Sequence, residues 1–585
     1  MSRWRTLVGL EIHAQLSTKS KLFSRASTQV GCAVNSQVSL VDAATPGTLP
    51  TLNGQCVDLA LRTGVALNAR IPEVSAFDRK HYFYADLPQG YQITQQRMPV
   101  VGTGILDFEV DPSRAVDKSG KIAIDSAQKQ KGKKKQKQKT LATFPRSLTI
   151  ERIQLEQDAG KSKHGVKEDM QHVDLNRSGC ALIEIVTRPD LRSPAEVGAA
   201  VRQLRTLLRH LHVCDGDMAQ GKLRVDVNVS THEILVSDEE LARVEAKLLS
   251  QEEELRHNRQ INKTDEIDDT GFGLRLLKSG VLGPGERVEL KNLSSVSALE
   301  RCVAIEEDRQ LELRRANRPI ERETRDFDAL KLTSTRLRRK EDMLDYRFMA
   351  EPDLPLLRVS PSRVERIRAG MPELPADMLR RFINELNVAE KDAKMIVNNM
   401  PICEYFLAAL ESPSETNSRD ARKLAAWVTA QLAAEMTRSD LLWNRDTPPV
   451  TPQQLAQLVD LVSSEEVSTR RAKDVLAVMC DAYYDNEPVP APKDVIAEHN
   501  WNLEKNVDVV REHVCAVLDP LDDKDKTVKG AMKHAGKLNF LQGLVFQRHG
   551  ELHPQTVQEV LTEEFVQRFG EPKWLRKRAV LAAAE

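Results

Sequence analysis

The sequence predicts an α+β protein in which a strand-rich first half precedes an almost entirely helical second half. Alternation of apolar and polar residues recurs through the first 300 residues, with Gly and Pro between the alternating segments, as in strands of a sheet with one polar face. After about residue 298 helical spacing takes over and few strand patterns return. A chain of 585 residues exceeds what one hydrophobic core usually organises, so several domains are expected.

The composition is typical of a globular protein and argues against a membrane protein. Apolar residues make up 41% and charged residues 29%, and no apolar run approaches the roughly 18 residues that a membrane span needs. The formal net charge is −1, so any binding of nucleic acid has to come from local basic patches. The eight cysteines show no CxxC pair and no zinc-type spacing, which indicates reduced thiols. We expect no clear presequence, because the first residues pass at once into a strand pattern.

Capping signals locate two helices and one break between helical segments. Ser193 and Glu196 around a proline are typical of a capping box at the start of a helix that extends to about residue 211. Thr451 and Gln454 mark a second start in the same way. The polar and proline-containing stretch 436–450 precedes this second helix and predicts a break there.

Two stretches interrupt the strand-rich half. Residues 111–140 lose periodicity and include the run KQKGKKKQKQK, which predicts a disordered surface insertion or, alternatively, a nonspecific phosphate-binding arm. Residues 232–285 form a second insertion, acidic and then basic, with a short helix expected around 237–249.

Several strands place charged residues on one face. Alternation puts Glu11 and His13 on the same side of the first strand, and it separates Glu156 from the apolar residues around it. Glu184 lies inside the apolar run ALIEIV, where an unpaired carboxylate would be costly. Two further strands carry charged faces of their own, with Arg224, Asp226 and Asn228 on one and Arg287, Glu289 and Lys291 on the other.

If these faces converge, Glu11, His13, Glu156 and Glu184 hold too much negative charge to lie close together without a cation. Mg²⁺ suits such oxygen-rich ligands, and a magnesium cluster of this kind suits phosphoryl transfer from ATP. Taken separately, each residue is better explained as a paired surface carboxylate or a hydrogen-bonded histidine. The sequence contains no Walker A loop, no dinucleotide fingerprint and no G-x-S-x-G elbow.

Eight longer segments carry a family resemblance. Together they resemble the B subunit of aspartyl/glutamyl-tRNA(Asn/Gln) amidotransferase, in the same order and with similar spacing. The resemblance covers nearly the whole chain and fades in residues 108–143, in 232–285 and in parts of the C-terminal region. The segments are VGLEIHAQLSTKSKLFS, PGTLPTLN, FDRKHYFYADLPQGYQITQ, LEQDAGKSKH, DLNRSGCALIEIVTRPD, RVDVNVS, RVELKNLSSV and DYRFMAEPDLPLL.

The resemblance implies three domains and a reaction. A cradle domain built on antiparallel sheet would span residues 1–297, a helical domain 298–437, and a YqeY-like helical tail 438–585. The implied reaction uses ATP to activate the γ-carboxylate of tRNA-bound glutamate, after which ammonia displaces phosphate to give glutaminyl-tRNA(Gln). The expected partners are Glu-tRNA(Gln), an A-type amidase partner that supplies ammonia from glutamine, and a small third subunit of C or F type. The alternative is a noncatalytic tRNA-binding scaffold of the same complex.

The resemblance also assigns residues. The metal and catalytic positions fall on Glu11, His13, Glu156 and Glu184, the residues that strand alternation also groups. Candidates for binding ATP or the transferred phosphoryl group are Lys161, Arg224, Asp226 and Lys291. The ammonia route and acceptor end match Lys80, Tyr82, Tyr84, Asp86, Tyr91 and Gln92. In the tail, contact with tRNA is expected from Lys529, Lys533, Lys537 and Arg548, which are otherwise an exposed helix surface.

Departures from the family pattern indicate an organellar copy, for which we expect the mitochondrial matrix. Many bacterial members have Lys where this chain has Gln89, and a second Glu where it has Gln157. Because an amide cannot be an ionised ligand, the metal shell of this chain depends on Glu156. Ser294 and Val296 stand where an Asn-x-Phe pattern is usual. The pair 349–350, Met-Ala, replaces a more usual Phe-Pro.

Overall fold

The computed structural model describes residues 3–112, 143–167, 170–262, 271–339, 345–414, 419–443, 446–522, 524–572 and 574–575. Apart from residues 111 and 112, the predicted Lys-rich insertion lies outside the described residues. The chain divides into two compact units, Met1–Pro375 and Ala376–Glu585, which are described separately.

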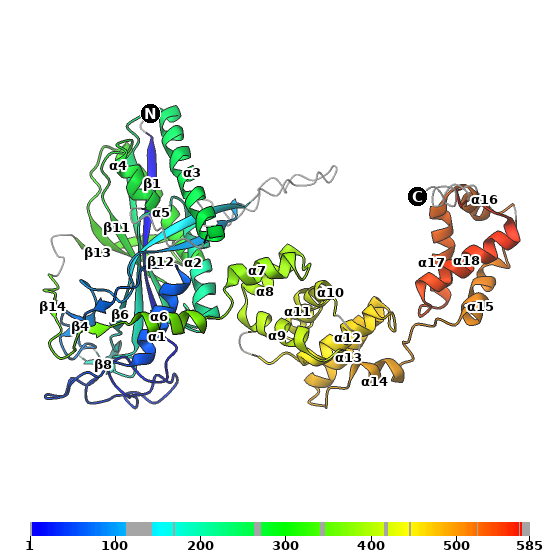
Figure 1. Cartoon of the computed structure of the whole chain (residues 1–585), viewed down its shortest axis with the longest axis horizontal. Coiled ribbons are helices and arrows are strands. Elements are labelled where there is room, and N and C mark those ends of the chain that lie inside the picture. The colour runs from blue at the N-terminus through cyan, green and yellow to red at the C-terminus, as the bar shows by residue number, and fades with distance from the viewer. Residues whose placement is uncertain are drawn as a thin grey trace. The chain divides into compact units, whose positions relative to one another are not determined.

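The first unit is built on a large sheet of long strands (Figure 1). Within the described residues this sheet has eight strands in the order β13-β12-β11-β10-β1-β9-β6-β5. All pairs are antiparallel except β11 and β12, which run parallel. The strands are β1 (Trp4–Gln15), β5 (Gly104–Val110), β6 (Phe144–Gln157), β9 (Ala181–Thr187), β10 (Leu223–Glu233), β11 (Val288–Leu293), β12 (Glu323–Asp328) and β13 (Thr333–Arg339). The predicted α+β class, with a largely antiparallel sheet followed by helices, is confirmed.

One face of the sheet is apolar and covered by helices. The predicted alternation in β1 is observed, because Leu10, Ile12 and Ala14 are buried while the residues between them are partly exposed. Side chains of this face form one core with α1 (Gly54–Ala66) and α2 (Pro194–His210), and with α5 (Val296–Arg315). The polar residues that alternate with these apolar residues, such as Glu11 and His13, lie on the opposite face of the sheet.

Helix α2 begins as predicted. Ser193 accepts a hydrogen bond from the backbone N–H of Glu196 and is the N-cap. The reciprocal half of the capping box is absent in this described segment, since the Glu196 carboxylate accepts from the backbone N–H of Arg192 instead. The carboxylate also pairs with Arg146, so the helix start is fixed to the sheet.

The expectation of an almost entirely helical chain after residue 298 holds for α5 but is wrong for the strands between Glu323 and Arg358. Helix α5 connects β11 to β12 as a crossover between parallel strands, so the sheet continues beyond residue 297, where the first domain was expected to end. The short strands β14 (Met349–Ala350) and β15 (Leu357–Arg358) follow. Strand β12 has the sequence ETRDFD, with little apolar alternation to reveal it.

Smaller sheets bring the segment 74–94 to the main sheet. Strand β3 (Asp78–His81) lies between β4 (Tyr91–Thr94) and β14, and β4 packs against β6. Two further pairs are β2 (Val74–Ser75) with β15, and β7 (Lys161–Lys167) with β8 (Met170–Asp174). These pairings place aromatic and polar residues of the first 100 positions beside β6.

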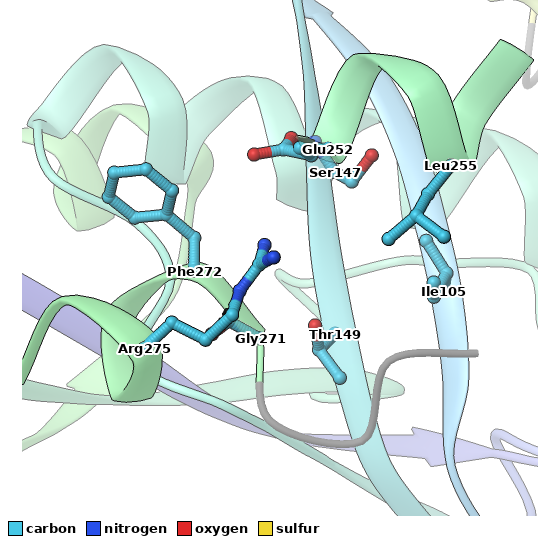
Figure 2. Close-up of a pocket in the computed structure, with 8 residues that line it drawn as sticks. All are labelled: Ile105, Ser147, Thr149, Glu252, Leu255, Gly271, Phe272 and Arg275. Carbon is cyan, nitrogen blue, oxygen red and sulfur yellow. Dashed lines mark hydrogen bonds between the residues drawn. The ribbon is translucent and has the colours of Figure 1, made fainter. Parts of the chain in front are cut away.

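The second insertion is folded onto the sheet. The predicted helix around 237–249 is confirmed and is longer, α3 (Asp238–Asn262), followed by α4 (Gly271–Lys278). Their apolar residues Leu241, Leu248 and Phe272 pack with Leu7 of β1. Figure 2 shows a small cavity between these helices, β5 and β6, and its volume of about 20 Å³ is far too small for a nucleotide.

The described part of the second unit is helical and includes two hydrophobic clusters, one between residues 378 and 496 and one between residues 510 and 565. The helices are α7 (Pro375–Asn384), α8 (Glu390–Val397), α9 (Met400–Glu411), α10 (Ala421–Ala426), the π-helix η4 (Trp427–Leu432), α11 (Ala433–Arg438), α12 (Pro452–Ser463), α13 (Thr469–Tyr484), α14 (Pro492–Glu498), α15 (Val507–Leu518), α16 (Lys526–Lys533), α17 (Ala535–Arg548) and α18 (Pro554–Phe569). None of the described helices combines the length and the apolar character that crossing a membrane requires.

The capping box predicted at Thr451 and Gln454 is confirmed. The break predicted just before it does not separate two cores. Val450 is fully buried and its carbonyl accepts a hydrogen bond from the Tyr405 hydroxyl, so residues on both sides of position 437 pack into the first cluster.

Candidate active site on the polar face of the sheet

Three of the four predicted ligands lie together on adjacent strands. His13 on β1 stands opposite Glu184 on β9, and Glu156 extends from β6 on the far side of β9. The His13 Nε2 atom is 3.8 Å from Glu156 Oε1 and 3.9 Å from Glu184 Oε2. One ligand atom from each residue lies within 4.8 Å of the others, which is a spacing that suits a shared cation.

Glu11 is placed beside this group rather than in it. It lies two residues before His13 on the same face and stands opposite Asp226 of β10. Its Oε1 atom accepts a hydrogen bond of 3.0 Å from Asn228 Nδ2. The negative charge of Glu11 nevertheless helps to raise the pKa of Glu184. Among the described residues, the close cluster is therefore His13, Glu156 and Glu184, with Glu11 at its edge.

Burial sets the electrostatics of the cluster. It raises the pKa of Glu156 and of Glu184, and it lowers the pKa of His13, despite opposing contributions from neighbouring charges. Glu156 Oε2 is buried and accepts no hydrogen bond from the described residues. A buried carboxylate oxygen without a donor is an available metal ligand, so the residues present fit a divalent cation.

Lys80 of β3 provides positive charge at the same place. Its Nζ is 4.0 Å from Glu156 Oε2 and lies over the rings of Tyr82 and Tyr346, at 6.0 and 5.2 Å from their centroids. Burial acts to lower the pKa of Lys80, but Glu156 and Glu184 outweigh it and the pKa is raised. The lysine therefore stays charged and offsets part of the carboxylate charge.

Two buried amides hold the carboxylates. Gln92 Nε2 donates to Glu156 Oε1 over 2.7 Å and to the Gln157 carbonyl over 2.6 Å. Gln154 Nε2 donates to Glu184 Oε2 over 2.6 Å. The sequence did not single out Gln154, because a neutral amide in an alternating strand carries no charge signal.

The predicted phosphate-binding residues lie in two places, on the polar face of the main sheet and on a separate small sheet. Arg224 stands opposite His13 and donates to Asp158 over 3.0 Å, so its guanidinium is held at the edge of the cluster. Lys291 on β11 pairs with Asp226 at 2.7 Å and with Glu289 at 3.0 Å, and these carboxylates raise its pKa against the effect of burial. These pairs lie on the same polar face as His13. Lys161 instead begins β7 of a separate two-stranded sheet, with its side chain exposed.

Only some of the residues predicted to border the ammonia route lie close to Glu156. Lys80 and Gln92 approach Glu156, and the Tyr82 hydroxyl donates to Gln92 Oε1 over 3.1 Å. Tyr84 is exposed and its ring meets that of Tyr82, with centroids 5.5 Å apart. The other two are engaged elsewhere: Tyr91 lies under the Arg79 guanidinium at 4.3 Å, and Asp86 accepts from Ser162 at 3.0 Å.

Two of the departures from the resembled family contact each other. Gln157 Nε2 donates to Gln89 Oε1 over 3.0 Å, and Gln89 Nε2 donates to the Val41 carbonyl, also over 3.0 Å. The Met349–Ala350 pair forms β14 and pairs with β3, so its conformation is an edge strand beside Lys80.

In the second unit, the lysines predicted to contact tRNA are exposed. Lys529 and Lys533 lie on α16, and Lys537 lies on α17. Arg548 ends α17 and donates to the Ala516 carbonyl, so part of its guanidinium is already engaged.

The fold and the cluster define a catalytic α+β domain with a carboxylate–histidine site, followed by a helical region. A family profile described as the GatB/GatE catalytic domain matches residues 6–267 and 274–365, and a second, described as the GatB domain, matches residues 409–565. Over 583 residues the chain is 37% identical to the mitochondrial B subunit of glutamyl-tRNA(Gln) amidotransferase from Phytophthora infestans, covering 96% of this chain and 95% of that protein. Over 562 residues it is 33% identical to the B subunit of aspartyl/glutamyl-tRNA(Asn/Gln) amidotransferase from Pelagibacter ubique, covering 96% of both chains.

The chain therefore belongs to the B subunits of the tRNA-dependent amidotransferases, multi-subunit ligases that act in translation.

Proposed function

We propose that this protein uses ATP to activate the γ-carboxylate of glutamyl-tRNA(Gln), and that ammonia then converts the activated group to the amide of glutaminyl-tRNA(Gln). The observation that supports this most directly is the cluster of His13, Glu156 and Glu184, with one carboxylate oxygen of Glu156 buried and free of donors among the described residues. Its ligand set suits Mg²⁺, which in phosphoryl transfer neutralises phosphate oxygens beside an anionic nucleophile.

The residues of the chain have separable roles in this reaction. His13, Glu156 and Glu184 would hold the cation, with Glu11 beside them. Arg224 and Lys291 would face phosphate oxygens. Hydrogen bonds to Asp158 and to Asp226, respectively, hold these two cationic groups in position. In the first step a γ-carboxylate oxygen bonds to the terminal phosphorus of ATP and ADP leaves. In the second step the nitrogen of ammonia bonds to the acyl carbon, phosphate leaves and the nitrogen loses a proton.

Ammonia would reach the acyl group past Lys80, Tyr82 and Gln92. These polar side chains contact one another next to Glu156 and would line such a route, and a positively charged Lys80 would disfavour ammonium while admitting the neutral molecule. We propose that an A-type amidase partner releases this ammonia from glutamine and that a small third subunit completes the complex. The mitochondrial relative from Phytophthora infestans supports a location in the mitochondrial matrix.

The experiment measures ATP hydrolysis by the assembled complex with and without glutamyl-tRNA(Gln). Glu156→Ala and Glu184→Ala should each abolish the stimulation by glutamyl-tRNA, because each removes a cation ligand. Glu151→Ala is the matched control, since Glu151 lies on the same strand but pairs with Arg152 and Arg188, and it should keep the stimulation.

Full stimulation in both ligand variants would reject the metal assignment. A wild-type complex that binds tRNA but shows no stimulation at all would favour the noncatalytic scaffold.

A further inference from the structure

We propose that Gln154 is a positioning residue of this site, which holds the Glu184 carboxylate in the orientation that a divalent cation requires. Gln154 on β6 stands directly opposite Glu184 on β9, so the two side chains meet across one step of the sheet. The inference rests on the metal site proposed above, and it concerns a residue that would not itself touch the metal.

The geometry of the Gln154 amide leaves little freedom. The side chain is 2% exposed, and its Nε2 donates to Glu184 Oε2 over 2.6 Å and to Thr94 Oγ1 over 3.1 Å. Its Oε1 accepts from Arg152 Nε over 3.1 Å. A reversed amide would place its oxygen against the carboxylate and its NH₂ against the guanidinium, so both contacts select the same orientation.

The contact restricts the Glu184 carboxylate. A charge-assisted hydrogen bond from a buried amide is short and directional, so it holds the acceptor oxygen in one orientation. Residues that orient metal ligands in this way typically change metal affinity by about 10- to 100-fold when they are removed.

Gln92 makes a similar contact with Glu156, but the two amides differ. Gln92 also donates to the Gln157 carbonyl and accepts from the Tyr82 hydroxyl, so its loss would disturb strand β6 and the aromatic residues as well. Both hydrogen bonds of the Gln154 NH₂ group go to side chains. Replacement of Gln154 is therefore the cleaner test of positioning.

The test measures Mn²⁺ binding to the full-length chain by electron paramagnetic resonance, without ATP or tRNA, because Mn²⁺ prefers the same carboxylate and water oxygens as Mg²⁺. Gln154→Met keeps the length of the side chain and removes the donor, and we expect about 10- to 100-fold weaker binding. Gln310→Met is the matched control. Gln310 is also buried, but it hydrogen-bonds the backbone of Thr231 and Val229, so its variant should unfold at lower temperature while its Mn²⁺ affinity is unchanged.

A double-mutant cycle separates positioning from general damage. If Gln154 acts through Glu184, Gln154→Met should weaken binding no further in a Glu184→Gln background. If Gln154→Met does not fold, Gln154→Asn decides instead, since it keeps a polar amide but is one methylene shorter and withdraws the donor from Glu184; weaker Mn²⁺ binding is expected, and unchanged binding overturns the proposal.

Two results would count against the proposal in different ways. Unchanged Mn²⁺ affinity in a folded Gln154→Met variant, or an equal further loss in the Glu184→Gln background, overturns the positioning role and leaves the proposed reaction intact. Failure of the wild-type chain to bind Mn²⁺ overturns the metal site and the positioning role together.

Discussion

Gln89 and Gln157 stand where many members of the resembled family carry a lysine and a glutamate, and in this chain they hydrogen-bond each other over 3.0 Å. Gln157 is buried, and its backbone carbonyl accepts from Gln92, which also holds Glu156. A neutral amide pair therefore connects these two positions. It keeps a further negative charge away from a site whose carboxylates are already hard to ionise.

We expect the two positions to be coupled. Gln157→Glu alone should lower the free energy of unfolding by about 3 to 5 kcal/mol, because it leaves a buried carboxylate facing an amide. Gln89→Lys in the same chain should recover much of that loss. The check is urea unfolding of both single variants and the double variant, with the coupling taken from the cycle. Additive losses in the double variant would show that the pair does not act as a unit.

Strand β10 connects the catalytic face to the region that holds the second insertion. Arg224 and Asp226 lie on its polar side near the cluster, and His232 lies close to its other end. His232 Nδ1 is 2.9 Å from the Gly283 carbonyl, and Nε2 is 2.9 Å from Ser230 Oγ. A neutral imidazole with its proton on Nδ1 satisfies both contacts, since Nδ1–H donates to the carbonyl and Nε2 accepts from the hydroxyl.

The buried imidazole of His232 on this strand should make the free energy of unfolding depend on pH. Burial lowers the pKa of His232 below its ordinary value of 6.5, outweighing the Gly283 carbonyl, and the charge of Arg314 acts in the same direction as burial. The folded state prefers the neutral form. Its contribution to the free energy of unfolding is therefore complete above about pH 6.5 and is lost as the pH falls through the lower folded-state pKa.

The measurement compares melting temperatures between pH 7.5 and pH 5. His232→Gln should reduce the fall in melting temperature on acidification relative to the wild type, whereas His212→Gln, at an exposed position, should not. An identical pH profile in wild type and His232→Gln would show that the imidazole does not titrate on unfolding.

At the scale of the whole molecule, the candidate site lies entirely within the first unit, and the exposed basic residues of α16 and α17 lie within the second. The net charge of −1 gives no overall attraction for tRNA, so local groups have to supply it. Lys529, Lys533 and Lys537 are exposed and close in sequence, which suits contact with phosphates.

We expect these lysines to contribute to the salt dependence of tRNA binding. Replacing all three with Gln should make the log–log slope of affinity against salt shallower by up to about 3, since each phosphate contact contributes roughly 0.9. The measurement is a salt titration of tRNA affinity in the assembled complex. Replacing Lys391, Lys423 and Lys473, which are exposed on other helices of the same unit, is the charge-matched control. A slope that is unchanged in the first variant would remove this surface from the tRNA contact.

Local patterns in the sequence were sufficient for much of the architecture. Alternation in β1 identified its buried face and grouped Glu11 with His13, because successive side chains in a strand point to opposite sides. Capping residues located the starts of α2 and α12 because those interactions lie within one turn of the chain. The carboxylate inside the apolar run of β9 marked Glu184 as a residue that needs a partner.

Only the tertiary structure decided which residues meet. The register of β1, β9 and β6 places His13, Glu156 and Glu184 together and leaves Glu11 beside them, and register depends on pairing between segments that are distant in the sequence. The β11–α5–β12 crossover extends the sheet past residue 297, which the weak alternation of β12 could not show. Lys80 reaches Glu156 from a small separate sheet, and Gln154 and Thr94 enter the network as neutral groups. A local pattern records which way a side chain points, whereas its partner is determined by the packing of the whole unit.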